Sequence, residues 1–223
     1  MKLLLLVGFV SQISLFGQPA PGANDRYRTL EGRAGMAASL DGEHRDARQK
    51  PKELIAALRI KPGMTVVDIG TGVGYMLPFL SAAVGPRGSV VAEDIFPDFL
   101  EKAKQKASHL KNVSFVLGTE KDPNLDTAFA DLIFILDAYH HFDYPEEMMS
   151  RIRRALKPGG KLAIIDYYKR PGAMANANPN FAVTHIRLDE ADVVAQIESF
   201  GYRAILREAF LPNSQWLALF EKK

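Results

Sequence analysis

Short apolar segments alternate with helix-forming segments along most of the chain, and this alternation limits the fold more than any other feature. The apolar segments are bounded by Gly, Pro, Asn or charged residues, which is typical of parallel strands buried on both faces. Repeated strand–helix units predict a doubly wound α/β sheet. The expected strands are Thr65–Ile69, Ser89–Ala92, Val113–Leu117, Asp131–Leu136 and Lys161–Ile165, and the expected helices between them are Leu77–Val84, Asp98–His109 and Pro145–Leu156.

The chain after Tyr168 departs from this rhythm. An irregular stretch is followed by a helix near Asp189–Phe200 and by two strand-like segments, Arg203–Phe210 and Trp216–Phe220. The turn Leu211–Ser214 between these segments predicts an antiparallel hairpin. With the five earlier strands, this gives a mostly parallel, seven-stranded sheet that ends in a hairpin. The chain has 223 residues, 47% of them hydrophobic, and we expect one core in one α/β domain.

The N-terminal segment has the order of a secretory signal peptide. Lys2 precedes the apolar run Leu3–Phe16, and small or helix-breaking residues follow from Gly17 to Ala23. The run is shorter than the roughly 20 apolar residues of a membrane-spanning helix, so no stable membrane span is expected. A cut after Gly22 satisfies the small-x-small preference of signal peptidases. We therefore expect residues 1–22 to be a signal peptide of an exported, for example periplasmic, protein.

A start codon assigned too early is the alternative, and the protein would then be cytoplasmic and begin at Met36 or nearby. The chain contains no Cys, which excludes disulfides, thiolate zinc sites and cysteine nucleophiles. A chain without thiols suits reducing and oxidising compartments equally. Cysteine content therefore does not decide between the two locations.

Three glycines, Gly70, Gly72 and Gly74, directly follow the first expected strand. Glycines at such a turn let a ligand approach the backbone, and the next helix offers unpaired N–H groups. A dinucleotide-binding turn requires glycine where this chain has Tyr75, so that function is excluded by spacing. The pattern Gly-x-Gly-x-Gly preceded by Asp68 closely resembles motif I of class I S-adenosylmethionine (SAM)-dependent methyltransferases. The resemblance implies SAM as the cofactor and places Asp68, Gly70, Thr71, Gly72 and Gly74 around it.

Acidic residues follow the second strand in the order that this family uses. Asp94, with Glu93 as the reserve, resembles the family's acid that accepts hydrogen bonds from both ribose hydroxyls. After the third strand, relatives commonly place an acid that contacts the adenine amine, whereas this chain has Thr119. The adenine contact is then left open between the Thr119 hydroxyl, Glu120 and Asp122.

The end of the fourth strand and the turn before the fifth resemble the small-molecule branch of the family. In that branch the segment beginning here at Asp137 lines the site, and we expect Asp137 to be among the cofactor-binding residues. A turn like Lys157–Gly160 leads into the fifth strand. The sequence Asp-Ala-Tyr-His stands where amide and adenine-amine methyltransferases have Asn-Pro-Pro-Tyr. A formal net charge of +2 gives no strong field for a polyanion. We therefore expect a small-molecule methyl acceptor and no nucleic acid.

Methyl transfer from a sulfonium is an in-line displacement, which requires no nucleophilic side chain. A general base helps only when the acceptor is protonated. Tyr139, His140 and His141 are the candidate catalytic residues, and side-chain directions predict that only one of the two histidines faces the pocket. No metal site is expected. The alternative function is a catalytically inactive SAM-binding protein that acts as a sensor or scaffold.

The segment Glu43–Pro51 resembles the lid that relatives place over bound SAM, although a solvated charged helix or linker has the same composition. The resemblance as a whole spans about Lys50 to Tyr168. We therefore expect an N-terminal cap or lid segment at residues 23–53 and a methyltransferase domain at residues 54–223.

Overall fold

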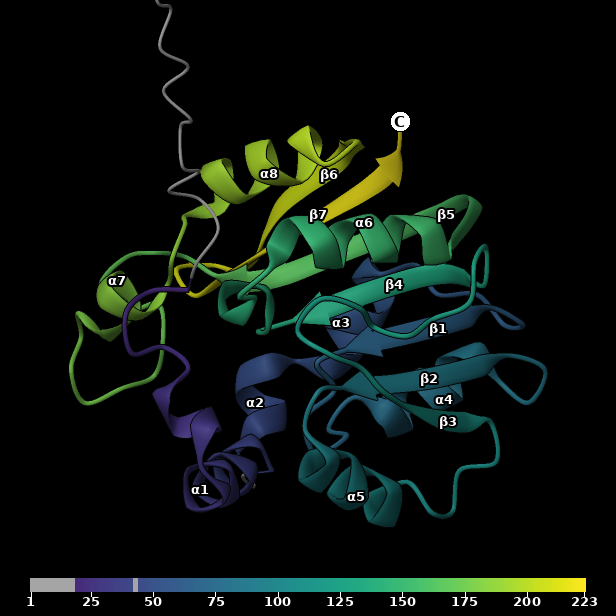
Figure 1. The fold of residues 1–223 in the computed structure, drawn as a ribbon, viewed down its shortest axis with the longest axis horizontal. Coiled ribbons are helices and arrows are strands. Elements are labelled where there is room, and N and C mark those ends of the chain that lie inside the picture. Colours follow the sequence, from purple (N-terminus) through teal and green to yellow (C-terminus); the bar gives the residue numbers. More distant parts are fainter. Residues whose placement is uncertain (1–18, 42–43) are drawn as a thin grey trace, which may run out of the picture.

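The computed structural model describes residues 19–41 and 44–223. These residues form one sheet of seven strands with helices around it (Figure 1). The strand order is β3-β2-β1-β4-β5-β7-β6; the pairs among β1 to β5 are parallel, and β7 is antiparallel to both β5 and β6. The expected doubly wound sheet with its C-terminal hairpin is confirmed. The strands are β1 (Thr65–Ile69), β2 (Ser89–Asp94), β3 (Val113–Leu117), β4 (Ala130–Leu136), β5 (Leu156–Tyr167), β6 (Tyr202–Leu211) and β7 (Gln215–Lys222).

Helices cover both faces of the sheet (Figure 1). Alternate residues of β1 point to opposite faces, so that Val67 packs with α6 and α8, whereas Val66 packs with α3 and α4. Burial on both faces explains why the central strands are continuously apolar. The helical elements are η1 (Asp25–Arg28), α1 (Leu30–Leu40), α2 (Arg45–Gln49), α3 (Pro51–Ala57), α4 (Leu77–Val84), α5 (Pro97–Lys106), η2 (Tyr139–His141), α6 (Pro145–Ala155), α7 (Phe181–His185) and α8 (Glu190–Ser199).

The expected turn at Lys157–Gly160 is a bulge inside β5 rather than a separate connection. Ala130 of β4 pairs with Leu156, and Leu132 pairs with Lys161, so the intervening residues of β5 leave the ladder. Gly159 has a φ of +77°, which glycine adopts without strain. The helix before it, α6, therefore ends at Ala155, and strand pairing begins at the next residue.

The segment before β1 packs against the glycine turn and α5. Ala37 of α1 lies in one apolar cluster with Val73 and Phe99, and the ring of Tyr27 stacks on Phe96 at 5.8 Å. In Figure 1, α1 and α2 lie beyond the carboxyl ends of the central strands. This part of the expected cap therefore covers the edge of the sheet where ligands bind in open α/β folds.

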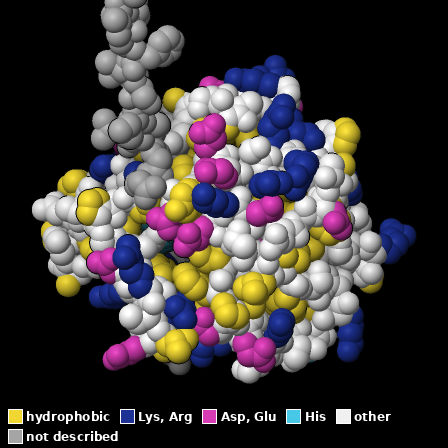
Figure 2. All heavy atoms as spheres, viewed as in Figure 1, with side chains coloured by type: hydrophobic (Ala, Val, Ile, Leu, Met, Phe, Trp, Pro, Cys, Tyr) yellow, Lys and Arg dark blue, Asp and Glu magenta, His cyan; other side chains and the backbone are white. Residues whose placement is uncertain are grey.

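Residues 1–18 of the expected signal peptide lie outside the described residues. Within the described ranges, no helix combines the length and apolar character that a bilayer crossing requires. Figure 2 shows basic and acidic side chains mixed with apolar ones across the face in view.

Candidate active site

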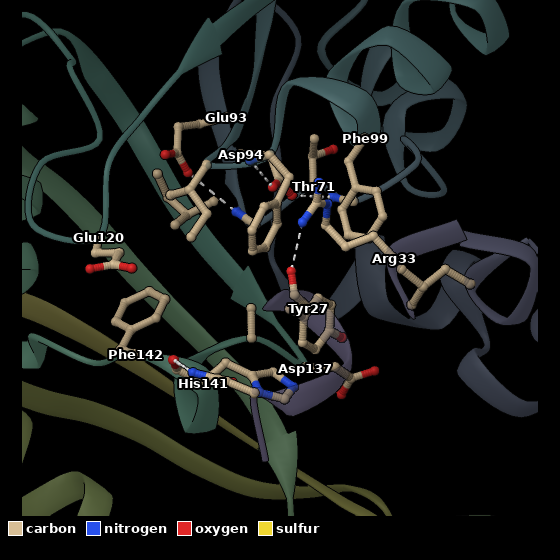
Figure 3. A pocket seen from close by; sticks show the side chains of 18 of the residues that line it. Tyr27, Arg33, Thr71, Glu93, Asp94, Phe99, Glu120, Asp137, His141 and Phe142 are labelled. Carbon is tan, nitrogen blue, oxygen red and sulfur yellow. Dashed lines mark hydrogen bonds between the residues drawn. The ribbon is translucent and has the colours of Figure 1, made fainter. Parts of the chain in front are cut away.

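A cavity of about 500 Å³ lies at the carboxyl ends of β1, β2 and β4, under η1 and α1 (Figure 3). Three elements of the sheet and the N-terminal cap thus contribute its walls. Its lining includes residues of the glycine turn, both acids of β2, and the segment after β4: Ile69, Gly70, Thr71, Gly72, Glu93, Asp94, Ile95, Glu120, Leu136, Asp137, Ala138, His141, Phe142 and Asp143.

The glycine turn requires glycine for its backbone. Gly70, Gly72 and Gly74 have φ values of +70°, +57° and +79°, in the left-handed region that other residues rarely adopt. Gly70 and Gly72 line the cavity. Gly74 lies behind them, where an added Cβ would come within 3.1 Å of Ala103 on α5. Asp68 also lies behind the turn, and its Oδ2 accepts a hydrogen bond from the Thr71 hydroxyl at 2.8 Å.

Two adjacent buried carboxylates, Glu93 and Asp94, end β2 and line the cavity. Oδ2 of Asp94 accepts from the Gly72 N–H at 2.8 Å, and Oδ1 accepts from the Phe96 N–H at 2.9 Å. Burial raises the Asp94 pKa to about 6. Oε2 of Glu93 accepts from the Gly70 N–H at 3.3 Å, whereas Oε1 is buried without a hydrogen-bond partner among the described residues. Burial, with the neighbouring Asp94 charge, raises the Glu93 pKa well above its usual value.

This pair fits a ribose diol. Both residues face the cavity, so the expected ribose role of Asp94 and the reserve role of Glu93 are both geometrically accessible. The oxygen without a partner belongs to Glu93, but it is buried against Gly118 rather than exposed to the cavity, so the reserve role of Glu93 stays a prediction.

Of the three positions left open for the adenine contact, Glu120 lines the cavity, and neither Thr119 nor Asp122 does. The Thr119 hydroxyl oxygen accepts hydrogen bonds from the backbone N–H groups of Lys121 and Asp122 and so closes its own loop. The Asp122 carboxylate pairs with Arg151 at 3.2 Å. An adenine contact by Thr119 stays a prediction, without geometric support from this cavity.

Asp137 directly follows β4 with a φ of +56°, a strained conformation for a residue with a side chain. Its Oδ1 accepts from Nε2 of Gln215 at 2.5 Å, and Gln215 is itself bonded to Gln49 of α2. Burial, with the nearby Asp166 charge, raises the Asp137 pKa to about 7. Figure 3 shows Asp137 and His141 across the cavity from Glu93 and Asp94.

The three candidate catalytic residues occupy η2 and point in different directions. His141 lines the cavity, and burial lowers its pKa well below the usual range. Tyr139 is fully buried in the core, where its hydroxyl donates to Oε1 of Gln196 at 2.7 Å. His140 is buried beside Asp166, with 2.7 Å between Nδ1 and the carboxylate. Only His141 can therefore touch a ligand in the cavity directly, and the catalytic roles stay predictions.

The cap contributes residues whose roles the sequence did not indicate. Asn24, Tyr27 and Arg33 all line the cavity. Nε of Arg33 lies 2.9 Å from both carboxylate oxygens of Asp98 on α5, so an ion pair fixes the cap to the sheet layer. Arg45, from the expected lid segment, lines the cavity with its guanidinium 4.0 Å from the centre of the Tyr75 ring. These contacts join residues that are distant in sequence, so no local sequence pattern predicts them.

The strand order, the glycine turn and the acids of β2 define the fold class of SAM-dependent methyltransferases. Residues 67–164 match the family model described as a methyltransferase domain, and together with the fold this match indicates SAM as the cofactor.

Comparisons with known proteins agree with this assignment. The SAM-dependent methyltransferase of Aquifex aeolicus superposes with a TM-score of 0.76 at 28% identity, over 83% of this chain and 96% of the other. The ubiquinone/menaquinone biosynthesis C-methyltransferase UbiE of Shewanella frigidimarina is 33% identical over 130 residues, which are 56% of this chain and 50% of UbiE. The chain thus spans about half the length of this curated relative.

The fold alone does not define the reaction. The cyclase SpnF has the same fold, with a TM-score of 0.71 at 13% identity over 92% of this chain and 98% of its own. A likeness of this kind shows the fold alone and not the chemistry, because one fold hosts many activities.

Proposed function

We propose that the protein transfers the methyl group of SAM to a small-molecule acceptor. The observation that carries the proposal is the cavity of about 500 Å³, which joins the glycine turn and the β2 acids on one side to Asp137 and His141 on the other. Its volume lies in the range of small-molecule sites. One cavity therefore offers a cofactor half and an acceptor half.

The residues of the chain bind and orient the reactants. Gly70 and Gly72 let the cofactor approach the backbone, and Glu93 and Asp94 accept hydrogen bonds from its ribose hydroxyls. SAM supplies the methyl group on a positively charged sulfur. The carboxylates that line the cavity offset this charge, and the cap formed by η1 and α1 excludes water from the reacting atoms.

The relatives narrow the acceptors that should be tested first. UbiE proteins are named as C-methyltransferases of ubiquinone and menaquinone biosynthesis. Quinone precursors are therefore the first acceptors to test. Transfer to nucleic acid is disfavoured because the net charge is only +2 and both signs of charge mix on the surface in Figure 2.

Calorimetric titration with SAM, S-adenosylhomocysteine and NAD tests the cofactor, and incorporation of a labelled methyl group from SAM tests the reaction. Binding of SAM and S-adenosylhomocysteine with transfer to an acceptor in the screen supports the proposal. Binding of SAM without transfer to any acceptor supports the alternative of an inactive sensor or scaffold. Binding of NAD in place of SAM overturns both.

We also propose that residues 1–22 are a cleaved signal peptide, as their residue order predicts. The cavity supports a mature chain that begins near Ala23 over a chain that begins at Met36. The shorter chain would lack Asn24, Tyr27 and Arg33, all of which line the cavity.

A further inference from the structure

Three histidines from two distant segments meet on the side of the cavity that His141 lines. His140 and His141 lie on η2, and His185 ends α7. The ring centroids of His140 and His141 are 4.0 Å apart, and the His185 ring lies 5.1 Å from the first and 5.3 Å from the second. One ring nitrogen from each lies within 4.8 Å of the others. Zinc–nitrogen bonds are about 2.0 to 2.1 Å long, so the three nitrogens would move closer together when they share one ion.

Polar partners on the far side fix two of the three rings. Nδ1 of His140 lies 2.7 Å from Oδ1 of Asp166, and Nδ1 of His141 lies 2.7 Å from Oδ1 of Asn24. Each Nδ1 then carries the proton that it donates to oxygen, and each Nε2 keeps its lone pair. Carboxylates and carbonyl oxygens orient metal-binding histidines in this way.

His140 provides an independent sign of a missing ligand. Its side chain is 4% exposed, and its Nε2 has no hydrogen-bond partner among the described residues. A buried nitrogen without a partner is costly, since water is lost and nothing replaces it. A ligand that accepts the lone pair removes this cost.

We propose that His140, His141 and His185 bind a divalent transition-metal ion of the zinc class. Three imidazole side chains suit zinc and its neighbours in the first transition row. Calcium and magnesium are disfavoured because they require mainly oxygen ligands. The proposal revises the sequence-based expectation of no metal site, which had no means of bringing His185 to the adjacent pair.

The site would connect to the cavity through His141, which lines it on the side opposite Glu93 and Asp94. Three protein ligands leave a tetrahedral ion one position for water or substrate, as in catalytic zinc sites. If the proposed methyl transfer holds, an acceptor hydroxyl or thiol would occupy that position. The acceptor would lose its proton to water and attack the methyl carbon, which breaks the carbon–sulfur bond and releases S-adenosylhomocysteine.

This assignment and the predicted base role of His141 exclude each other. A ring that binds an ion through Nε2 has no lone pair there to accept a proton, and its Nδ1 is already bonded to Asn24. Metal binding therefore decides between two roles for one residue.

The test uses the tag-free full chain, freed of metal with a chelator and dialysed. Zn²⁺ is titrated by calorimetry and Co²⁺ by its visible absorption, which reports tetrahedral coordination. We expect one equivalent of either ion to bind and Zn²⁺ to raise the unfolding temperature, because binding to the native state stabilises it. No stoichiometric binding to the wild-type protein overturns the proposal.

The variants His185→Gln and His140→Gln each remove one ligand and should lower the affinity for Zn²⁺ by at least about tenfold. His185 is only half-buried at the end of α7, so its variant tests the site with little risk to folding. His109→Gln is the matched control, because His109 is exposed on the surface. Wild-type affinity in both ligand variants overturns the proposal. SAM titration of the same samples reports the proposed function separately, since the glycine turn and β2 acids are retained.

Discussion

Asn24 holds both the backbone and the ring of His141. Its Nδ2 donates to the His141 carbonyl oxygen at 3.0 Å, and its Oδ1 lies 2.7 Å from Nδ1 of the ring. Tyr27, three residues later, packs its ring edge-on against the same imidazole at 5.0 Å. The cap therefore both covers the cavity and sets the orientation of the one candidate catalytic histidine that faces it.

The variant Asn24→Ala should destabilise the protein by about 1 to 3 kcal/mol, because three side-chain hydrogen bonds at a half-buried site are lost, two to His141 and a longer one to Asp143. For a chain of this size, that corresponds to a fall of roughly 2 to 12 °C in the unfolding temperature, measured by circular dichroism. Asn176→Ala is the control, since Asn176 is exposed in a loop. Equal unfolding temperatures for the two variants would show that the Asn24 contacts contribute nothing.

Gly72→Val should abolish SAM binding while the sheet persists. The φ of +57° at Gly72 disfavours a β-branched residue, and the added Cβ would lie 3.2 Å from Cδ1 of Leu40, where the cap closes over the turn. Gly159→Val is a matched control, because Gly159 has a φ of +77° with open space around its Cβ position, far from the cavity. Its backbone strain is similar, so it should lose stability but keep its affinity for SAM. Calorimetry with SAM separates the two effects.

The fold was largely predictable because its signals are local. The apolar runs around Val66 and Ile133 needed only their neighbours in sequence to be recognised as buried strands, and the turn at Leu211–Ser214 identified the hairpin. Strand ends were less certain. β2 continues through Glu93 and Asp94, two carboxylates that a strand accommodates because the glycine turn supplies N–H donors to both.

The site was predictable only where a motif carries it. Gly70, Gly72 and Asp94 follow from spacing and order, whereas the contact of Asn24 with His141 joins segments that only the folded sheet brings together. The same limit applies to His185, whose surroundings in sequence carry no pattern. Tyr139 is the opposite case. It is close in sequence to a residue that lines the cavity, but its hydroxyl points away from the cavity and donates to Gln196 on α8.

Substitution of either acid of β2 should weaken SAM binding and also affect the stability of the protein. Asp94→Asn and Glu93→Gln each replace a charged acceptor, whose hydrogen bonds are worth about 1.5 to 3 kcal/mol, and should weaken SAM binding by about tenfold or more. Both acids also accept from N–H groups of the glycine turn, Asp94 from Gly72 at 2.8 Å and Glu93 from Gly70 at 3.3 Å, so both variants should in addition lose stability, and Asp94→Asn more because its hydrogen bond is shorter. Asp126→Asn, on the surface, is the control. A larger loss of SAM affinity in Glu93→Gln would assign the ribose contact to the reserve residue.

Asp68 gives a prediction about pH. Burial raises its pKa from 3.8 to about 7, against the opposing effects of the Thr71 hydrogen bond and the Arg45 charge, and the Asp94 charge raises it slightly further. A folded-state pKa above the unfolded value means that the native protein binds the proton more tightly. Stability is therefore fully present below the unfolded pKa and is lost as pH rises towards the folded pKa of about 7.

Asp68→Asn removes this loss and keeps an oxygen that accepts from the Thr71 hydroxyl. We expect the variant to gain unfolding free energy relative to wild type at about pH 8 but not at about pH 4, as measured by urea denaturation at the two values. Asp126→Asn, with its exposed carboxyl, should show the same difference from wild type at both values. A constant difference for Asp68→Asn would contradict the prediction.

The position of the mature N-terminus should change how tightly the protein binds SAM. A cut after Gly22 would remove the backbone hydrogen bonds from Ala23 N–H to Ala20 and from Asp25 N–H to Gly22, but it would leave Asn24 and its contacts with His141 in place. The mature chain should therefore bind SAM as the full chain does. A chain begun at Met36 loses the cap residues and should bind SAM at least about tenfold more weakly, since the hydrogen bonds and cover that they supply are gone.

Fractionation of the native host, followed by N-terminal sequencing, measures the outcome directly. We expect a chain that begins near Ala23 in an exported fraction. A protein that starts at Met1 or Met36 in the cytosolic fraction would refute export, and a membrane-bound chain that keeps Met1 would identify the segment as an anchor. The comparison of SAM affinities tests the role of the cap, which sequencing alone does not. If the chain from Met36 binds SAM as tightly as the chain from Ala23 does, then the cap residues Asn24, Tyr27 and Arg33 do not help to hold the cofactor. The cavity then favours neither start.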